Sequence, residues 1–220
     1  MTGVPDKSAI NRLYVEGADD FHVICALARR GGVSWTNDDP GIPFAPKTSG
    51  DKDAIKQART AVKAGTHRRV GLVVDANGDP EARWATIRAA FAEFEAAPFG
   101  FTLPATYPTE GVVAEGHERS FVGVWMMPGD NRPGAVESFL DSLVPRTELW
   151  SHAVEATHAA RAKGALFPDK DLLRAQLRAW LAWQKTPGAP YGRAIDSGYL
   201  ASTSPQADAL VAWFRRLFSV

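Results

Sequence analysis

Short apolar runs alternate along the chain with longer segments of helical periodicity, and this alternation is the feature that most constrains the fold. Three runs are almost entirely apolar after their first position: "RLYV" at 12–15, "RVGLVV" at 69–74 and "FVGVWMM" at 121–127. Strands that are apolar on both faces are typical of parallel sheets, which helices cover on both sides. The sequence therefore predicts an α/β fold with a mostly parallel central sheet and helices on both faces.

The longer segments predict the helices, and their ends carry helix-capping signals. Asp79 precedes Pro80 in the favoured N-cap position of one helix, and Gly65 ends another. The expected helices span 18–32, 51–65, 80–97, 135–144, 170–185 and 204–218. Two further short strands, at 33–36 and 42–46, are expected around the turn "NDDPG".

The pattern changes near residue 150, because the segments after it are mainly helical. We therefore expect an α/β domain at 1–150 and a C-terminal helical extension at 151–220 that packs on it. Within the extension, Trp180 and Trp183 fit one apolar helical stripe and are interpreted as core or interface residues.

The balance of charge gives no general indication of a nucleic-acid partner. The 25 Lys and Arg residues equal the 25 Asp and Glu residues, so a polyanion would have to contact a local patch. Small basic clusters lie at 67–69 and 214–216. They are interpreted as solvated surface, with phosphate contact as the alternative.

Cysteine content and hydropathy exclude two further classes of protein. The single cysteine, Cys25, cannot form an internal disulfide framework or a zinc site of several cysteines, and it is interpreted as a small buried residue. No apolar stretch approaches the ~18 residues of a membrane span, and the first ten residues lack the apolar core of a signal peptide. We expect a cytoplasmic protein with no membrane contact.

An acidic residue follows each of the three apolar runs. Glu16 and Asp75 come directly after the first two, and Asp130 follows the third. Parallel strands bring these positions to one edge of the sheet, which is where open α/β sheets bind ligands. Carboxylates that meet there repel one another unless a cation neutralises them. Oxygen ligands without paired His or Cys favour Mg²⁺ or Mn²⁺ over zinc, so we interpret Glu16 as part of a metal-binding group of acids.

The order of these residues resembles the Toprim family. The similar features are Glu-Gly at 16–17 after the first strand, an Asp-x-Asp-like element at 75–77, and Glu137 in the "VESFL" helix. The chain is similar over nearly its whole length to small standalone Toprim-like proteins of bacteria and archaea, which are related to the nuclease domain of the OLD family. The segments that carry this similarity are "LYVEGADD", "VVDANGDPEARW", "GVWMMPGDNRPGAVESFLDSLV" and "RAWLAWQKTPGAPYGRAI". The resemblance implies a Toprim-like, Rossmann-like sheet.

The resemblance also implies a set of site residues. Glu16 and Asp75 would be catalytic, and Asn77 stands where the family has the second Asp of its pair. An amide oxygen still binds a hard cation but carries no charge, which would weaken one metal position, and Asp79 is a candidate to compensate. The implied metal ligands are Glu16, Asp20, Asp75, Asn77, Asp79 and Glu137.

Three functions fit this pattern. The first is a Mg²⁺-dependent phosphoryl-transfer enzyme, a DNA or RNA nuclease, in which two ions ~4 Å apart would activate water and stabilise the leaving oxygen. The second is a non-catalytic module that binds nucleic acid or a protein, which Asn77 and the neutral charge favour. The third is a metal phosphatase of small phosphoesters. A separate ATPase partner follows from the resemblance alone, because OLD nuclease domains are commonly joined to an ATPase and this chain has no Walker A motif.

Most of the acids also have a structural interpretation. The alternatives are an N-cap for Asp79, first-turn helix charges for Asp19 and Asp20, a turn residue for Asp130, and a solvated helix face for Glu137 and Asp141.

Overall fold

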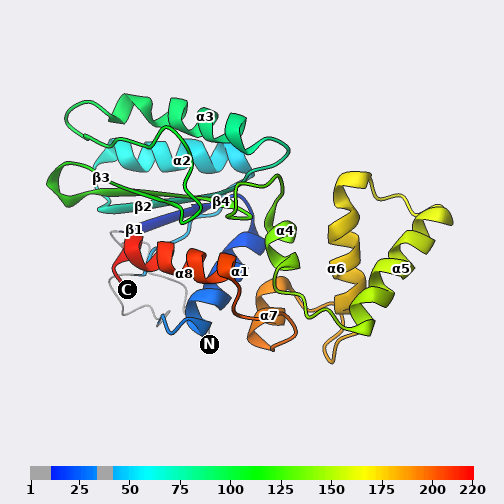
Figure 1. Ribbon diagram of the computed structural model, residues 1–220. Coiled ribbons are helices and arrows are strands. Elements are labelled where there is room, and N and C mark those ends of the chain that lie inside the picture. The colour runs from blue at the N-terminus through cyan, green and yellow to red at the C-terminus, as the bar shows by residue number, and fades with distance from the viewer. Residues whose placement is uncertain (1–10, 34–41) are drawn as a thin grey trace.

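A four-stranded mixed sheet lies at the centre of the protein (Figure 1), in the strand order β1-β2-β4-β3. The computed structural model describes residues 11–33 and 42–220, so most of the predicted strand at 33–36 and the turn "NDDPG" lie outside the described residues. The strands are β1 (Asn11–Val15), β2 (Arg69–Asp75), β3 (Val112–Glu115) and β4 (Phe121–Met127). Strands β1, β2 and β4 are parallel, and β3 pairs antiparallel with β4. The predicted α/β class is confirmed.

Helices cover both faces of this sheet (Figure 1). On one face lie α2 (Asp51–Ala64) and α3 (Pro80–Phe91), and on the other lie α1 (Ala18–Arg30) and α8 (Pro205–Phe218). Because side chains alternate along a strand, each strand contributes to two separate cores. Val74 packs in the core under α2 and α3, whereas Val73 packs in the core that contains α1 and α8.

Two glycines allow α8 to approach the sheet closely. Gly71 of β2 and Gly123 of β4 are partners in register. A Cβ atom on Gly123 would lie 2.4 Å from a methyl group of Leu217, and one on Gly71 would lie 3.1 Å from the same methyl group. The close packing of α8 on the sheet therefore depends on the absence of side chains at these two strand positions.

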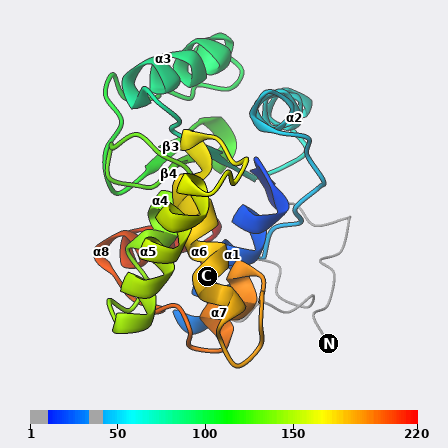
Figure 2. The same cartoon turned by 90° about the vertical axis from the view of Figure 1, so that its right-hand side faces the viewer.

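The remaining helices gather at the carboxyl end of the parallel strands (Figures 1 and 2). They are α4 (Val136–Asp141), α5 (Glu148–Ala162), α6 (Leu172–Ala182) and α7 (Tyr191–Asp196). Helices α5 and α6 form a hairpin that projects from this end, while α7 packs against α1. Short 3₁₀ turns occur at Ala92–Phe94, His117–Arg119 and Asp169–Asp171.

One buried cluster contains side chains from both sides of residue 150. The rings of Trp125 and Trp213 meet in it with centroids 5.9 Å apart. The division at residue 150 stays a prediction. Within residues 11–33 and 42–220, no helix combines the length and the apolar composition that crossing a bilayer requires.

The structure corrects several sequence predictions in detail. Helix α3 ends at Phe91, and a 3₁₀ turn replaces the predicted helix beyond it. The predicted strand at 42–46 is a single bridge in which Phe44 pairs with Arg12. Trp180 is buried as expected, but Trp183 is 44% exposed, because it follows the last residue of α6 and leaves the apolar stripe.

Candidate metal centre

Four acidic side chains converge at the carboxyl end of the parallel strands. Glu16 follows β1 directly, and Asp75 is the last residue of β2. Asp20 lies in the first turn of α1, and Glu137 lies in the first turn of α4. The charges of the other three raise the pKa of Asp75, so each of them lies within electrostatic reach of Asp75. We call these four residues the acidic cluster.

Burial makes two members of the acidic cluster unusual carboxyl groups. Burial first, and then repulsion from Asp20, Glu16 and Glu137, raises the pKa of Asp75 to about 8. Burial, with repulsion from Glu16 and Glu137, likewise raises the pKa of Asp20 to about 7, and this residue is only 5% exposed. The Oδ1 atoms of Asp20 and Asp75 are buried and accept no hydrogen bond from any residue that the structure describes. A buried acceptor without a donor is costly, so both oxygens are available to a partner such as a cation.

Glu16 is held in place by the neighbouring strand. The N–H group of Asp75 donates a hydrogen bond to Glu16 Oε2 over 3.1 Å. Burial raises the pKa of Glu16, against the effects of this hydrogen bond and of Arg83. Gly17 follows Glu16, and a Cβ atom there would lie 3.1 Å from Asp20 Oδ2. The small residue therefore lets β1 turn into α1 with Asp20 close to the strand end.

Two arginines pair with the acidic cluster. Arg83 of α3 lies 3.6 Å from Glu16 Oε2 through Nη2, and its Nε donates to the carbonyl oxygen of Asp75 over 3.0 Å. Arg174 of α6 donates from Nε to Glu137 Oε1 over 2.7 Å. The sequence analysis missed both arginines, because no local motif marks them and each reaches a partner on another element.

A third arginine, Arg178, forms an ion pair with Asp19. Arg178 of α6 pairs with Asp19 over 3.0 Å, and its guanidinium lies over the ring of Tyr191, 4.2 Å from the ring centroid. These contacts join α6 to α1 and α7. Asp19 therefore lies in the first turn of α1, as its structural interpretation predicts.

Asn77 and Asp79 lie in the exposed turn between β2 and α3. Asn77 has a positive φ of 58°, which Asn tolerates, and it exchanges two backbone hydrogen bonds of 2.8 and 2.7 Å with Gly134. Asp79 Oδ1 accepts a hydrogen bond from the N–H of Ala82 over 3.0 Å, so its predicted role as N-cap is confirmed. For both residues, a contribution to metal binding stays a prediction.

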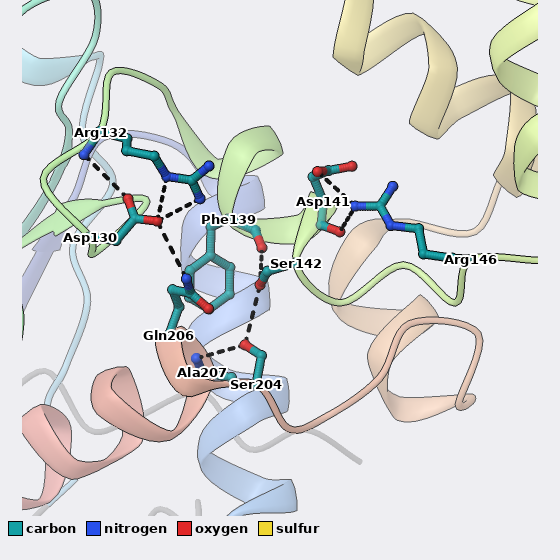
Figure 3. A network of polar contacts seen from close by, with 9 residues as sticks. All are labelled: Asp130, Arg132, Phe139, Asp141, Ser142, Arg146, Ser204, Gln206 and Ala207. Atoms are coloured by element: carbon teal, nitrogen blue, oxygen red, sulfur yellow. Dashed lines mark hydrogen bonds and ion pairs between the residues drawn. The ribbon is translucent and has the colours of Figure 1, made fainter.

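The acid after the third strand belongs to a different polar network (Figure 3). Asp130 Oδ2 accepts hydrogen bonds from Arg132 Nε over 2.7 Å and from Gln206 Nε2 over 3.3 Å. Asp141 pairs with Arg146 over 2.8 Å. The contacts of Asp130 join the loop after β4 to the start of α8, which agrees with the interpretation of Asp130 as a turn residue.

The two basic clusters bind main-chain oxygens. Arg69 donates to the carbonyl of Leu217, and Arg216 donates to the carbonyl of Glu110 over 2.6 Å. Arg215 donates to the carbonyl oxygen of the residue that caps the C-terminus of α1. Each of these arginines therefore has a structural role, and phosphate contact stays untested.

The acidic cluster fits a hard divalent cation in its chemistry. Its donors are carboxylate oxygens, which Mg²⁺ and Mn²⁺ prefer, and they outnumber the two arginines that face them. Among the described residues, no group of three or more Asp, Glu, His or Cys side chains has the arrangement needed to hold a metal ion. Glu16 and Glu137 each face an arginine, so a cation would compete with Arg83 and Arg174 for these two carboxylates.

Comparison with known proteins places the chain in a family. No curated protein and no solved structure matches it. A family model described as "Protein of unknown function (DUF3226)" matches residues 10–219, which is almost the whole chain. The chain therefore belongs to the DUF3226 family.

Proposed function

We propose that this protein is a Mg²⁺- or Mn²⁺-dependent phosphoryl-transfer enzyme of the Toprim type, a nuclease that cleaves DNA or RNA. The observation that carries the proposal is the pair of buried Oδ1 atoms, on Asp20 and Asp75, that accept no hydrogen bond. The Toprim assignment draws its support from the positions of Glu16 after β1 and Asp75 at the end of β2.

The members of the acidic cluster have separate roles in this proposal. Asp20 and Asp75 would hold the divalent cation, which would supply a Lewis acid and a water of lowered pKa. Glu16, oriented by the N–H of Asp75, accepts the proton of the attacking water while the new bond from oxygen to phosphorus forms. The bond to the leaving oxygen breaks, and this oxygen departs with the electron pair and takes a proton from solvent. Arg83 forms a 3.6 Å ion pair with Glu16 and donates a hydrogen bond to the end of β2. Nucleic acid is the proposed substrate, and a separate ATPase is proposed as a partner from the resemblance alone.

A second candidate is a non-catalytic module that binds nucleic acid or a protein partner. The observation that favours it is the neutral, exposed Asn77 in place of the second Asp of the Toprim pair. This candidate predicts that nucleic acid or a protein binds without metal-dependent cleavage.

Cleavage of supercoiled, linear and single-stranded DNA, and of RNA, tests the first candidate in Mg²⁺, Mn²⁺ and EDTA. We expect cutting that requires metal and that falls at least a hundredfold in Asp75→Asn and Glu16→Gln. Asp130→Asn is the matched control, because Asp130 lies in the separate network near α8, and it should retain activity. Equal activity in Asp75→Asn and Asp130→Asn would exclude the acidic cluster as the site. Turnover of small phosphomonoesters alone would favour a phosphatase.

A further inference from the structure

A pocket of about 470 Å³ opens against one side of α3. It is lined by α3 from Pro80 to Arg88, by the segment 105–107, and by Met126 and Asn131. Pro80 is the first residue of α3, and Met126 precedes the last residue of β4. The pocket, which we call the α3 pocket, therefore lies at the same edge of the sheet as the acidic cluster.

Helix α3 separates the α3 pocket from the acidic cluster. Arg83 contacts Glu16 and Asp75, whereas Glu81, Ala85 and Arg88 line the pocket. With 3.6 residues per turn, Arg83 projects from the helix on nearly the opposite side from these three. The two sites therefore lie on opposite sides of α3.

The α3 pocket has an apolar floor with polar groups around it. Trp84, Tyr107 and Met126 are almost fully buried, and the rings of Trp84 and Tyr107 meet edge to face with centroids 5.2 Å apart. Such a floor suits a flat, weakly polar ring rather than a free phosphate or a simple ion.

The polar groups around the floor retain unused hydrogen-bonding capacity. Within the described part of the chain, the Arg88 side chain makes a single, long hydrogen bond, from Nη1 to the carbonyl of Ala105 over 3.5 Å. The side chain of Asn131 donates to the carbonyl of Tyr107 over 3.1 Å, which leaves its amide oxygen available. Glu81 and Thr106 also line the pocket, so donors and acceptors both surround the apolar floor.

We propose that the α3 pocket binds an unpaired nucleobase of a single-stranded nucleic acid whose backbone passes the acidic cluster. A base presents an apolar face together with an edge of donors and acceptors, which is the combination that the pocket offers. A base inside a duplex cannot enter without leaving its stack, so the pocket selects single strands or unpaired positions. The proposal rests on the proposed nuclease function for the placement of the backbone.

The test fills the pocket without disturbing the core. Ala85 is an exposed residue of α3 that lines the pocket, so Ala85→Phe places a ring in the pocket. The control is Ala89→Phe, which makes the same change at an exposed position of α3 that does not line the pocket. Binding of a fluorescein-labelled single-stranded 12-mer, as DNA and as RNA, is measured by anisotropy in EDTA, beside the matching duplexes. We expect Ala85→Phe to weaken single-strand binding about tenfold or more and Ala89→Phe to change it less than twofold, with unchanged melting temperatures.

Several outcomes would overturn the proposal. These are equal binding by the two variants, an equal loss of duplex binding in Ala85→Phe, and no single-strand binding by the wild-type protein. Thr106→Val, which removes only a hydroxyl at the pocket, should show a smaller loss in the same assay.

The same variants separate this proposal from the nuclease function. Metal-dependent cleavage with no effect of Ala85→Phe would reject the pocket and keep the nuclease. Single-strand binding that depends on Ala85 without any cleavage would keep the pocket and reject the nuclease.

Discussion

At the scale of single residues, Asp75 and Asp20 tie the stability of the protein to pH in the reverse of the usual direction for carboxylates. Burial and repulsion raise their pKa values from 3.8 to about 8 and about 7. Between pH 3.8 and these raised values, the folded state binds more protons than the unfolded chain. The free energy of unfolding therefore falls as pH rises through this range. Without a cation, these two carboxyl groups therefore destabilise the folded protein most above about pH 8, where both are ionised.

Asp75→Asn should remove part of this pH dependence. In EDTA, the melting temperature of the variant should rise relative to that of the wild-type protein as pH increases from about 5 to about 8.5. The difference between the two melting temperatures should grow by ~2–4 °C for each kcal/mol of repulsion that the substitution removes. Differential scanning fluorimetry across this range measures the difference. Asp130→Asn is the control. Burial raises the pKa of Asp130, but hydrogen bonds from Arg132 and Gln206 outweigh this effect and lower the pKa. The difference in melting temperature between Asp130→Asn and the wild-type protein should therefore stay constant from about pH 5 to about pH 8.5. A constant difference for Asp75→Asn as well would contradict the raised pKa.

Arg174 supplies the positive charge that the buried carboxylate of Glu137 needs. Arg174→Gln should lower the free energy of unfolding in EDTA by about 1–3 kcal/mol, less than for a fully buried pair because Arg174 is half exposed. If Glu137 is a metal ligand, Mg²⁺ should raise the melting temperature of this variant more than that of the wild-type protein. Arg146→Gln, which removes a pair with the more exposed Asp141, should show neither effect. Equal responses to Mg²⁺ in all three proteins would remove Glu137 from the ligand set.

At the scale of elements, helix ends with capping side chains could be predicted and elements defined by pairing could not. The cap at Asp79 is a local interaction, and the structure has it. Strand β3 was missed, because it directly follows a passage rich in Pro and Gly and exists through antiparallel pairing with β4. Helix α7 was missed as well, since its six residues owe their stability to packing against α1 rather than to periodicity.

The cap of α8 provides a test at this scale. Ser204 Oγ accepts a hydrogen bond from the N–H of Ala207 over 3.1 Å, at the start of the helix that covers one face of the sheet. Ser204→Ala should lower the free energy of unfolding by about 1 kcal/mol, and the melting temperature by ~2–4 °C. Urea denaturation measures the change, with Ser151→Ala in α5 as control, because the Ser151 hydroxyl makes only a 3.5 Å contact within its helix. A loss no larger than that of the control would show that the cap contributes nothing.

At the scale of the whole molecule, the candidate site joins segments that lie far apart in the sequence. Its carboxylates could be predicted, because parallel strands bring residues such as Glu16 and Asp75 to one edge once the alternation of strands and helices is recognised. Its arginines could not, since Arg83 and Arg174 reach the acidic cluster only through the packing of α3 and α6. The α3 pocket escaped prediction for the same reason, because its wall combines a helix, a loop and a strand end.

The close approach of α8 to the sheet links the end of the chain to the strands that carry the site. Gly123→Ala should lower the free energy of unfolding by about 1–3 kcal/mol, because the added methyl group would meet Leu217. Leu217→Ala alone should cost about 2–5 kcal/mol, since Leu217 is fully buried. The double variant should be more stable than the sum of the single effects predicts, by ~0.5–3 kcal/mol, because the smaller side chain makes room for the methyl group. Denaturant unfolding of the four proteins measures this coupling, and Gly78→Ala, where nothing lies within 4 Å of the added atom, should show no coupling with Leu217→Ala. Additive effects of Gly123→Ala and Leu217→Ala would mean that the sheet tolerates a side chain beneath α8.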